Sequence, residues 1–252
     1  DYCRPSIRLA ALSHLKSIFV FTHDSIAVGE DGPTHEPVEQ TMSLRMIPGL
    51  TVLRPADANE TVEAWKVALE SKTASALVLS RQDLAILDRS GAQGDVSKGA
   101  YVIAGEDSAD VTLLATGSEV ELSLMARDLL AEHNVSARVV SMPSWEIFEQ
   151  QDEEYKASVL GDAGKPRVSV EAGTTLGWAT YTGGNGAHVG MESYGASGPG
   201  KEVLKFFGFT AEHVAATALR LLGQDDLADE LDKDFMDDHA AGKRMHGSEG
   251  HS

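Results

Sequence analysis

An alternation of short apolar runs with amphipathic segments constrains the fold of this chain more than any other feature. Residues 18–21, 51–53 and 76–79 are apolar runs of strand length, and we expect the first to be buried on both faces. The segments between them carry apolar side chains at helical spacing. Strand, helix, strand, helix, strand is typical of right-handed βαβ units on a parallel sheet, so the sequence predicts an α/β fold.

Helices are predicted at the start of the chain and between these strands. Ile7, Ala11 and Leu15 have helical spacing, so the chain begins just before or within a helix, and we interpret it as a fragment or a processed product. Pro37 suits the first turn of a helix that ends before Pro48. For the next helix, the predicted N-cap is Asn59 and the predicted buried face is Val62, Trp65 and Leu69.

A second α/β unit follows a glycine-rich stretch without periodicity. Ser118 and Glu121 fit a capping box that opens a helix between two predicted strands. The expected buried face of that helix is Leu122, Met125 and Leu129, and that of a later helix is Val214, Ala218 and Leu221.

Two consecutive α/β units with largely parallel sheets are therefore predicted. We divide the chain into residues 1–90, a linker at 91–99, a second unit at 100–223 and an acidic tail at 224–252. Leu227, Leu231 and Phe235 have helical spacing in the tail, which either docks as a helix or is solvated and partly disordered.

The composition excludes several classes of protein. A net charge of -18 argues against nucleic-acid binding, which needs a basic face. The single cysteine, Cys3, cannot form an internal disulfide and fits a reducing cytosol. No apolar run approaches the ~20 residues of a membrane span. We expect a cytoplasmic protein without nucleic-acid or membrane partners.

The stretch THDSIAVGEDGPTHEP, residues 22–37, concentrates the polar chemistry of the chain. His23 and His35 lack the spacing of a zinc motif, and GEDG lacks the alternating oxygen ligands of a calcium loop, so no metal site is predicted. Histidine titrates near neutral pH, and the glycines and Pro33 suit a rigid turn. We therefore expect acid-base and hydrogen-bonding roles for His23, Asp31 and His35.

Cationic side chains follow the predicted strands. His23, Arg54 and Arg81 each come just after a strand, and the carboxyl ends of parallel strands meet at one edge of a sheet. Because the protein is acidic overall, this local gathering favours an anion site. The alternative, that the arginines form ion pairs with nearby carboxylates, stays open at this point; these carboxylates are Asp24, Asp57 and Asp83.

The glycine-rich stretches TYTGGNG and YGASGPG carry less information. Neither matches G-x-G-x-x-G, so dinucleotide binding is not predicted. His133, His188 and His213 are expected to be surface or satisfied core residues and not ligands.

A family resemblance emerges from these motifs in combination. THDSIAVGEDGPTHEPVEQ resembles the transketolase signature, and RPADANE, LSRQDL, ATGSEVELS, ARVVSMPS, SVEAG and FFGFT follow in the order of that family. The resemblance extends to Leu222. It implies the second part of a pyrimidine-binding domain followed by a transketolase C-terminal domain.

The resemblance implies roles for individual residues. His23 and His35 match catalytic histidines, the first in contact with substrate and the second near the reacting carbons. Asp31 matches an aspartate that hydrogen-bonds a sugar hydroxyl. Arg81 matches an arginine that binds the sugar phosphate, and Tyr2 a tyrosine at the aminopyrimidine pocket of the cofactor. Ala27 stands where the family commonly has glycine, and Asp83 stands where it commonly has asparagine. Because Asp83 is close to Arg81 in the sequence, it could compete with a phosphate for that arginine.

The parent enzyme that the resemblance implies is a homodimeric transketolase of the pentose phosphate pathway. It moves a two-carbon ketol unit between ketose and aldose phosphates with thiamine diphosphate and Mg. The Gly-Asp-Gly module that binds metal and diphosphate does not occur in this sequence. Since the cofactor carries the hard chemistry, we expect the isolated chain to be inactive and to bind neither cofactor without the N-terminal part. The alternatives are a dihydroxyacetone synthase fragment and a non-catalytic assembly or dimerisation module.

Overall fold

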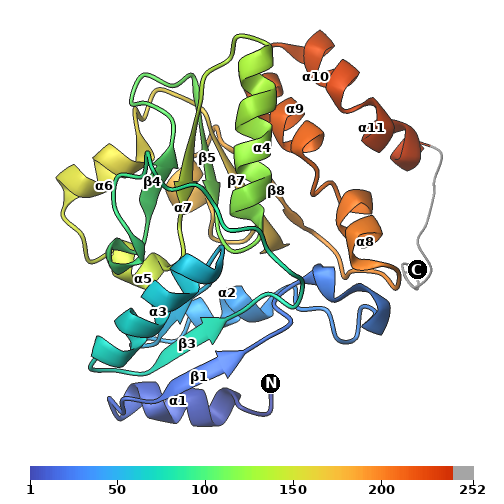
Figure 1. Cartoon of the computed structure of the whole chain (residues 1–252). Helices are drawn as coiled ribbons and strands as arrows, with labels where there is room; N and C mark the ends of the chain where they lie inside the picture. Colours follow the sequence, from blue (N-terminus) through green and yellow to red (C-terminus); the bar gives the residue numbers. More distant parts are fainter. Residues whose placement is uncertain (241–252) are drawn as a thin grey trace.

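Two α/β units stand side by side in a computed structural model that describes residues 1–240 (Figure 1). The first has a three-stranded parallel sheet in the order β1-β3-β2, which confirms the predicted βαβ alternation. Its elements are α1 (Arg4–Leu12), β1 (Ile18–Phe21), η1 (Ile26–Asp31), α2 (Gln40–Arg45), β2 (Thr51–Leu53), α3 (Ala58–Glu70) and β3 (Ser75–Val78).

The second unit has a five-stranded sheet in the order β4-β6-β5-β7-β8, in which only β4 runs antiparallel. The predicted α/β class with largely parallel sheets is thus confirmed. The elements are η2 (Val96–Lys98), β4 (Tyr101–Ala104), β5 (Val111–Ala115), α4 (Glu119–Glu132), β6 (Ala137–Ser141), α5 (Trp145–Phe148), α6 (Glu153–Leu160), β7 (Arg167–Thr174), α7 (Ala179–Thr182), β8 (Ala187–Met191), α8 (Gly200–Phe206), α9 (Ala211–Leu221), α10 (Asp225–Leu231) and α11 (Lys233–Ala240).

Helices cover both faces of the second sheet (Figure 1). Successive side chains of β5 point to opposite faces, so Leu113 packs in the cluster under α4 and α9 while Leu114 packs in the cluster of α5, α6 and Trp178. Both leucines are fully buried. Such burial on two faces explains why the strand reads as a continuous apolar run.

The structure corrects two predictions in the first unit. β1 is an edge strand of the described sheet, so it is only half-buried and Val20 is 44% exposed. Helix α2 begins at Gln40 and not at Pro37. The helix starts later because Val38 pairs with β7: the Val38 carbonyl accepts a 3.0 Å hydrogen bond from the Thr174 N–H.

The predicted faces and caps of α3 and α4 were wrong. Asp57, not Asn59, caps α3 by accepting from the Glu60 N–H. The hydroxyl of Ser118 donates to Glu119 and makes no cap bond, so the capping box with Glu121 is absent. On α3 the predicted face of Val62, Trp65 and Leu69 is exposed, and on α4 Met125 is exposed while Leu122 and Leu129 are only partly buried; the residues buried in their place are Glu60, Ala64, Ala68, Val120, Ser123, Ala126 and Leu130.

The tail forms docked helices up to Ala240. Asp232, which is 1% exposed, accepts hydrogen bonds from His213 Nδ1 and Arg220 Nη1 of α9. Burial opposes ionisation of Asp232, but the bonds from His213 and Arg220 prevail and lower its pKa. The predicted satisfied state of His213 is confirmed, and the docked alternative holds for residues 225–240; residues 241–252 lie outside the described part. Among the residues described, no helix is long and apolar enough to cross a membrane.

A buried ion cluster around Arg54 joins the two units. Arg54 follows β2, is 1% exposed and bonds Asp24 after β1 through Nε at 2.8 Å. Its Nη1 bonds Glu119 of α4 and, at 2.8 Å, the Thr116 carbonyl. Burial opposes the charge, but Glu119 and Asp24 raise the pKa of Arg54, so it stays protonated. The cluster holds strand ends from both sheets around one guanidinium.

Two more buried polar contacts cross the same junction. Arg45 of α2 forms a bidentate ion pair with Glu171 of β7, at 2.7 and 2.9 Å. Glu60 of α3 accepts hydrogen bonds from Tyr101 (2.7 Å) and Ser141 (2.5 Å) of the second unit. Because a buried charge is costly without its partner, these contacts oppose separation of the units.

Arg54→Met tests the stabilising role of the cluster. We expect a loss of about 3–5 kcal/mol in the free energy of unfolding, because the substitution leaves Asp24 and Glu119 buried without their cation. Urea unfolding measures the loss, with Arg127→Met as control since Arg127 pairs at the surface with Asp128 and should change stability by less than about 1 kcal/mol. Equal effects of the two substitutions would contradict this assignment.

Candidate active site between the two units

The loop after β1 is anchored at its base and exposed along its rim. Asp24 is buried against Arg54, and Ser25 caps η1 by accepting from the Ala27 N–H at 3.3 Å. The first four residues of η1 are buried. The base of the loop is therefore packed against the protein, while the side chains of the predicted site residues His23, Asp31 and His35 are all exposed.

His23 occupies a special backbone position where β1 ends. Its φ is 64°, a left-handed conformation that is uncommon for a residue with a side chain. Nδ1 of its ring lies 2.8 Å from the hydroxyl of Thr22. The side chain lines both of the cavities at this edge of the first sheet. This backbone conformation and the two cavities single out His23 within the loop.

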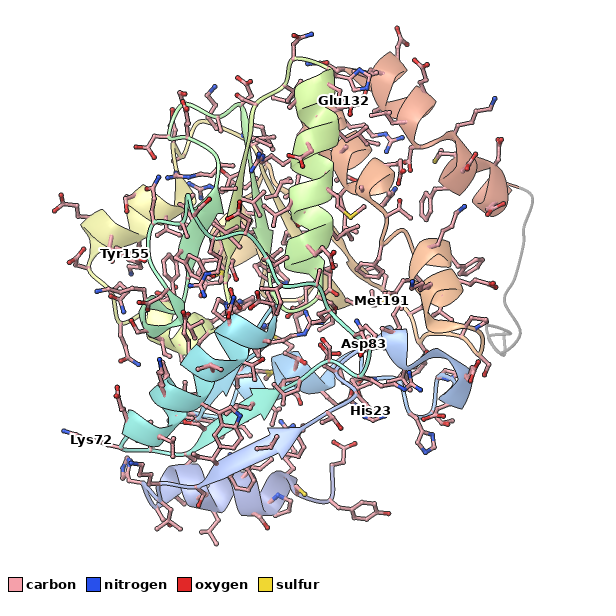
Figure 2. The ribbon with its side chains drawn as sticks, in the orientation of Figure 1. His23, Lys72, Asp83, Glu132, Tyr155 and Met191 are labelled. Carbon is pink, nitrogen blue, oxygen red and sulfur yellow. The ribbon has the colours of Figure 1, made fainter. Side chains whose placement is uncertain are left out.

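The larger cavity is a cleft of about 1100 Å³ between the units. His23 and Arg81 from the first unit line it together with Lys201 and Lys205 from α8. Figure 2 shows Asp83 beside His23 at the same junction. The cleft also contains Glu119, which is neutralised by Arg54, and Glu121. Four cationic or titratable nitrogen groups thus gather here in a strongly acidic protein.

The structure settles the open question about the two arginines. Arg54 belongs to the buried ion cluster and is not available for a ligand, so its suggested part in an anion site was wrong. Arg81 is exposed and, within residues 1–238, forms no ion pair with Asp83. Lys201 and Lys205 were missed, because only the tertiary fold brings α8 to the end of β3.

The smaller cavity has a volume of about 350 Å³, and Tyr2 is one of its lining residues. Its walls include Ile7, Phe21 and Val78, with Thr22 and His23 at one end. Tyr2 is fully exposed at the rim of this mostly apolar space. The shape and lining suit a flat aromatic ring with a few polar substituents.

Asp31 and His35 lie farther along the loop and line neither cavity. Nδ1 of His35 lies 2.9 Å from the hydroxyl of Thr34, and the backbone N–H of His35 donates to the Gly32 carbonyl. The structure thus brings His23 together with Arg81 in one cavity and with Tyr2 in the other. Asp31 and His35 are exposed on the loop outside both cavities. No group of three or more potential metal ligands occurs in the part of the chain that the structure describes.

The stretch YGASGPG, which the sequence left without a role, is the surface on which the loop rests. A Cβ at Gly29 would lie 2.6 Å from the Gly200 nitrogen and 2.7 Å from the Gly198 oxygen. A Cβ at Gly200 would overlap the Ala27 carbonyl oxygen. These glycines permit backbone-to-backbone contact, and their clustering was the sequence signal for it.

Comparison with known families gives two matches along the chain. Residues 1–86 match the model of the transketolase pyrimidine-binding domain, and residues 99–210 match the model of the transketolase-like C-terminal domain. Both predicted family assignments are confirmed.

Individual relatives agree with the family models. The chain is 57% identical to a transketolase of Halalkalibacterium halodurans over 88% of its own length and 34% of the relative. It resembles the structure of Leishmania mexicana transketolase (TM-score 0.82, 44% identity) and that of Pichia stipitis transketolase in complex with sedoheptulose 7-phosphate (TM-score 0.82, 42% identity), covering 88% of this chain and 32% of each. The chain spans about a third of the curated relatives it matches.

Gly200→Ala tests the contact between the loop and YGASGPG. The added methyl group overlaps Ala27, so we expect a cost of about 1–3 kcal/mol in unfolding free energy and faster hydrogen exchange in residues 26–32. Gly184→Ala is the matched control because no atom lies within 4 Å of its added Cβ. An unchanged exchange rate in the Gly200 variant would argue against the contact.

Proposed function

This chain belongs to the transketolase family, and we propose that it supplies the substrate-binding side of a site that transfers a two-carbon ketol unit between ketose and aldose phosphates. The observation that carries the proposal is the cleft where His23 and Arg81 meet Lys201 and Lys205. Asp83 and Glu121 also line this cleft, but a gathering of four nitrogen groups in a protein of net charge -18 favours an anion as the ligand.

We propose that Arg81 receives the phosphate of the sugar. Its exposed guanidinium has no carboxylate partner in the described part of the chain, so both of its edges are available for bidentate bonding. Lys201 and Lys205 add point charges on the opposite wall. We propose that His23, which follows the carboxyl end of β1 and lines both cavities, hydrogen-bonds the sugar between the phosphate and the smaller cavity.

His35 and Asp31 complete the proposed substrate side. Both are exposed on the loop that η1 anchors, and we propose that a sugar chain extending out of the cleft reaches them. We propose that Asp31 binds a sugar hydroxyl and that His35, like His23, moves or holds protons near the reacting carbons. The Pichia stipitis transketolase structure is a complex with sedoheptulose 7-phosphate, which supports a sugar phosphate as ligand.

The smaller cavity fits part of the family cofactor. The apolar walls around Phe21 and Val78, with Tyr2 at the rim, suit the aminopyrimidine ring of thiamine diphosphate. When bound, thiamine diphosphate supplies the carbanion stabilisation that ketol transfer needs. We propose that Mg and the diphosphate are held by residues outside these 252, as part of a homodimeric cytoplasmic enzyme of the pentose phosphate pathway.

An assembly role is favoured by exposed apolar side chains on the first unit. Val62 and Leu69 of α3 are each 56% exposed, and Leu12 of α1 is 72% exposed. We propose that another polypeptide covers these side chains, since contiguous exposed apolar surface is typical of protein–protein contacts. We propose residues 1–90 as the pyrimidine-binding part and 100–223 as the C-terminal domain of the assembly.

Arg81→Met, made in a full-length enzyme that contains this chain, tests the phosphate role. Loss of a charge-assisted bidentate contact costs about 1.5–3 kcal/mol, so we expect KM for sugar phosphates to rise roughly 10- to 150-fold. An acceptor without phosphate should show an unchanged KM, which serves as the internal control. A similar rise for both acceptors would mean that Arg81 does not read the phosphate.

A polypeptide of these 252 residues alone is predicted to carry out no ketol transfer, even with thiamine diphosphate and Mg. The reason is that the residues proposed here bind the sugar phosphate and one ring of the cofactor only. A coupled assay with ketose and aldose phosphates measures turnover, and cooperative urea unfolding of the same sample shows that it is folded. Turnover by the pure polypeptide would refute this division of labour.

A further inference from the structure

Glu36 is a buried carboxyl group inside the loop that carries the proposed site. It follows His35 directly and is only 4% exposed. Within residues 1–238, neither of its carboxyl oxygens has a well-formed hydrogen bond, and the backbone N–H groups of Ala196 and Gly29 are its nearest donors. A methyl group at Gly195 would overlap Oε2, so the carboxyl group is pressed against the start of the YGASGPG stretch.

The surroundings of Glu36 favour its neutral form. Burial raises the pKa of Glu36 to about 7, although the backbone N–H groups of Ala196 and Gly29 partly oppose the shift. Charged side chains do not contribute to this shift. The titratable groups on its own segment and on the facing segment all point to solvent: Glu30, Asp31, His35, Glu39, Glu192, Tyr194 and Lys201.

An ionised Glu36 is compensated in the closed arrangement only by the backbone N–H groups of Ala196 and Gly29, and not by a cation. A buried carboxylate without a cation or a full set of donors is strongly disfavoured, so it must gain water. Water can reach it only if residues 26–36 move away from residues 194–200, because the backbones of the two segments are in contact at Gly29 and Gly200.

We propose that Glu36 is a protonation-dependent latch that positions the loop of Asp31 and His35 against residues 194–200. With a neutral carboxyl group the loop is held closed, and with a carboxylate it opens. Glu36 is thus a positioning residue that acts through its neighbour His35. The consequence for catalysis rests on the proposed function, but the latch itself does not.

The sign of the pH dependence follows from the shift. The carboxyl group ionises near 4.5 when the loop is open and near 7 when it is closed. The closed form therefore loses stability as pH rises from about 4.5 to about 7, and the loss levels off above that range, where Glu36 is ionised in both forms. Between pH 6 and pH 8 the fraction of time that the loop is open should rise about tenfold.

Hydrogen exchange of the 252-residue chain at pH 6 and pH 8, corrected for intrinsic rates, tests the latch. Protection of residues 26–36 should fall about tenfold in the wild type and stay constant in Glu36→Gln, which keeps the shape of the neutral acid. Glu39→Gln, at an exposed position, is the matched control and should behave as the wild type. Equal pH dependence in Glu36→Gln and the wild type would overturn the proposal.

A second measurement keeps the test independent of how the variant folds. Carbon-13 NMR of the wild-type Glu36 carboxyl group should show a titration midpoint near 7. A midpoint below 5 would overturn the latch even if Glu36→Gln does not fold. Either negative result leaves phosphate binding by Arg81 untouched, so the failure of the latch is distinguishable from failure of the proposed function.

Discussion

The buried guanidinium of Arg54 joins the two units of this protein. It gathers Asp24, from the end of β1, and Glu119, from the start of α4, around one buried charge. Glu119 in turn accepts from the Ala172 N–H of β7. Since each ion would be costly to bury alone, the two sheets are held together by charges that only the intact junction satisfies.

This junction determines where the candidate site can form. Asp24 is the neighbour of His23, so the ion cluster anchors the loop at its first residues. The backbone contact of Gly29 with Gly200 anchors the same loop one turn later. The first unit supplies the loop and Arg81, and the second supplies the YGASGPG stretch, against which the loop packs, and the lysines of α8. The C-terminal unit therefore forms part of the candidate site.

The sequence predicted what depends on local pattern. The apolar runs revealed the strands, and the rule that ligands bind at strand ends brought His23 and Arg81 together correctly. The predictions of buried helix faces were wrong where apolar side chains are exposed, as at Val62. Apolar periodicity does not distinguish a helix face that packs in the core from one that lies on the surface. The pairing of Arg54 with Glu119 spans 65 residues, so no local pattern contains it.

The buried charges at the junction make the two units one cooperative structure. Native-state hydrogen exchange against urea can show this by following the amides of β3 in the first sheet and β5 in the second. Both sets of amides should converge on the same opening free energy. Exchange of β3 through a separate, lower-energy opening, with β5 still protected, would contradict it.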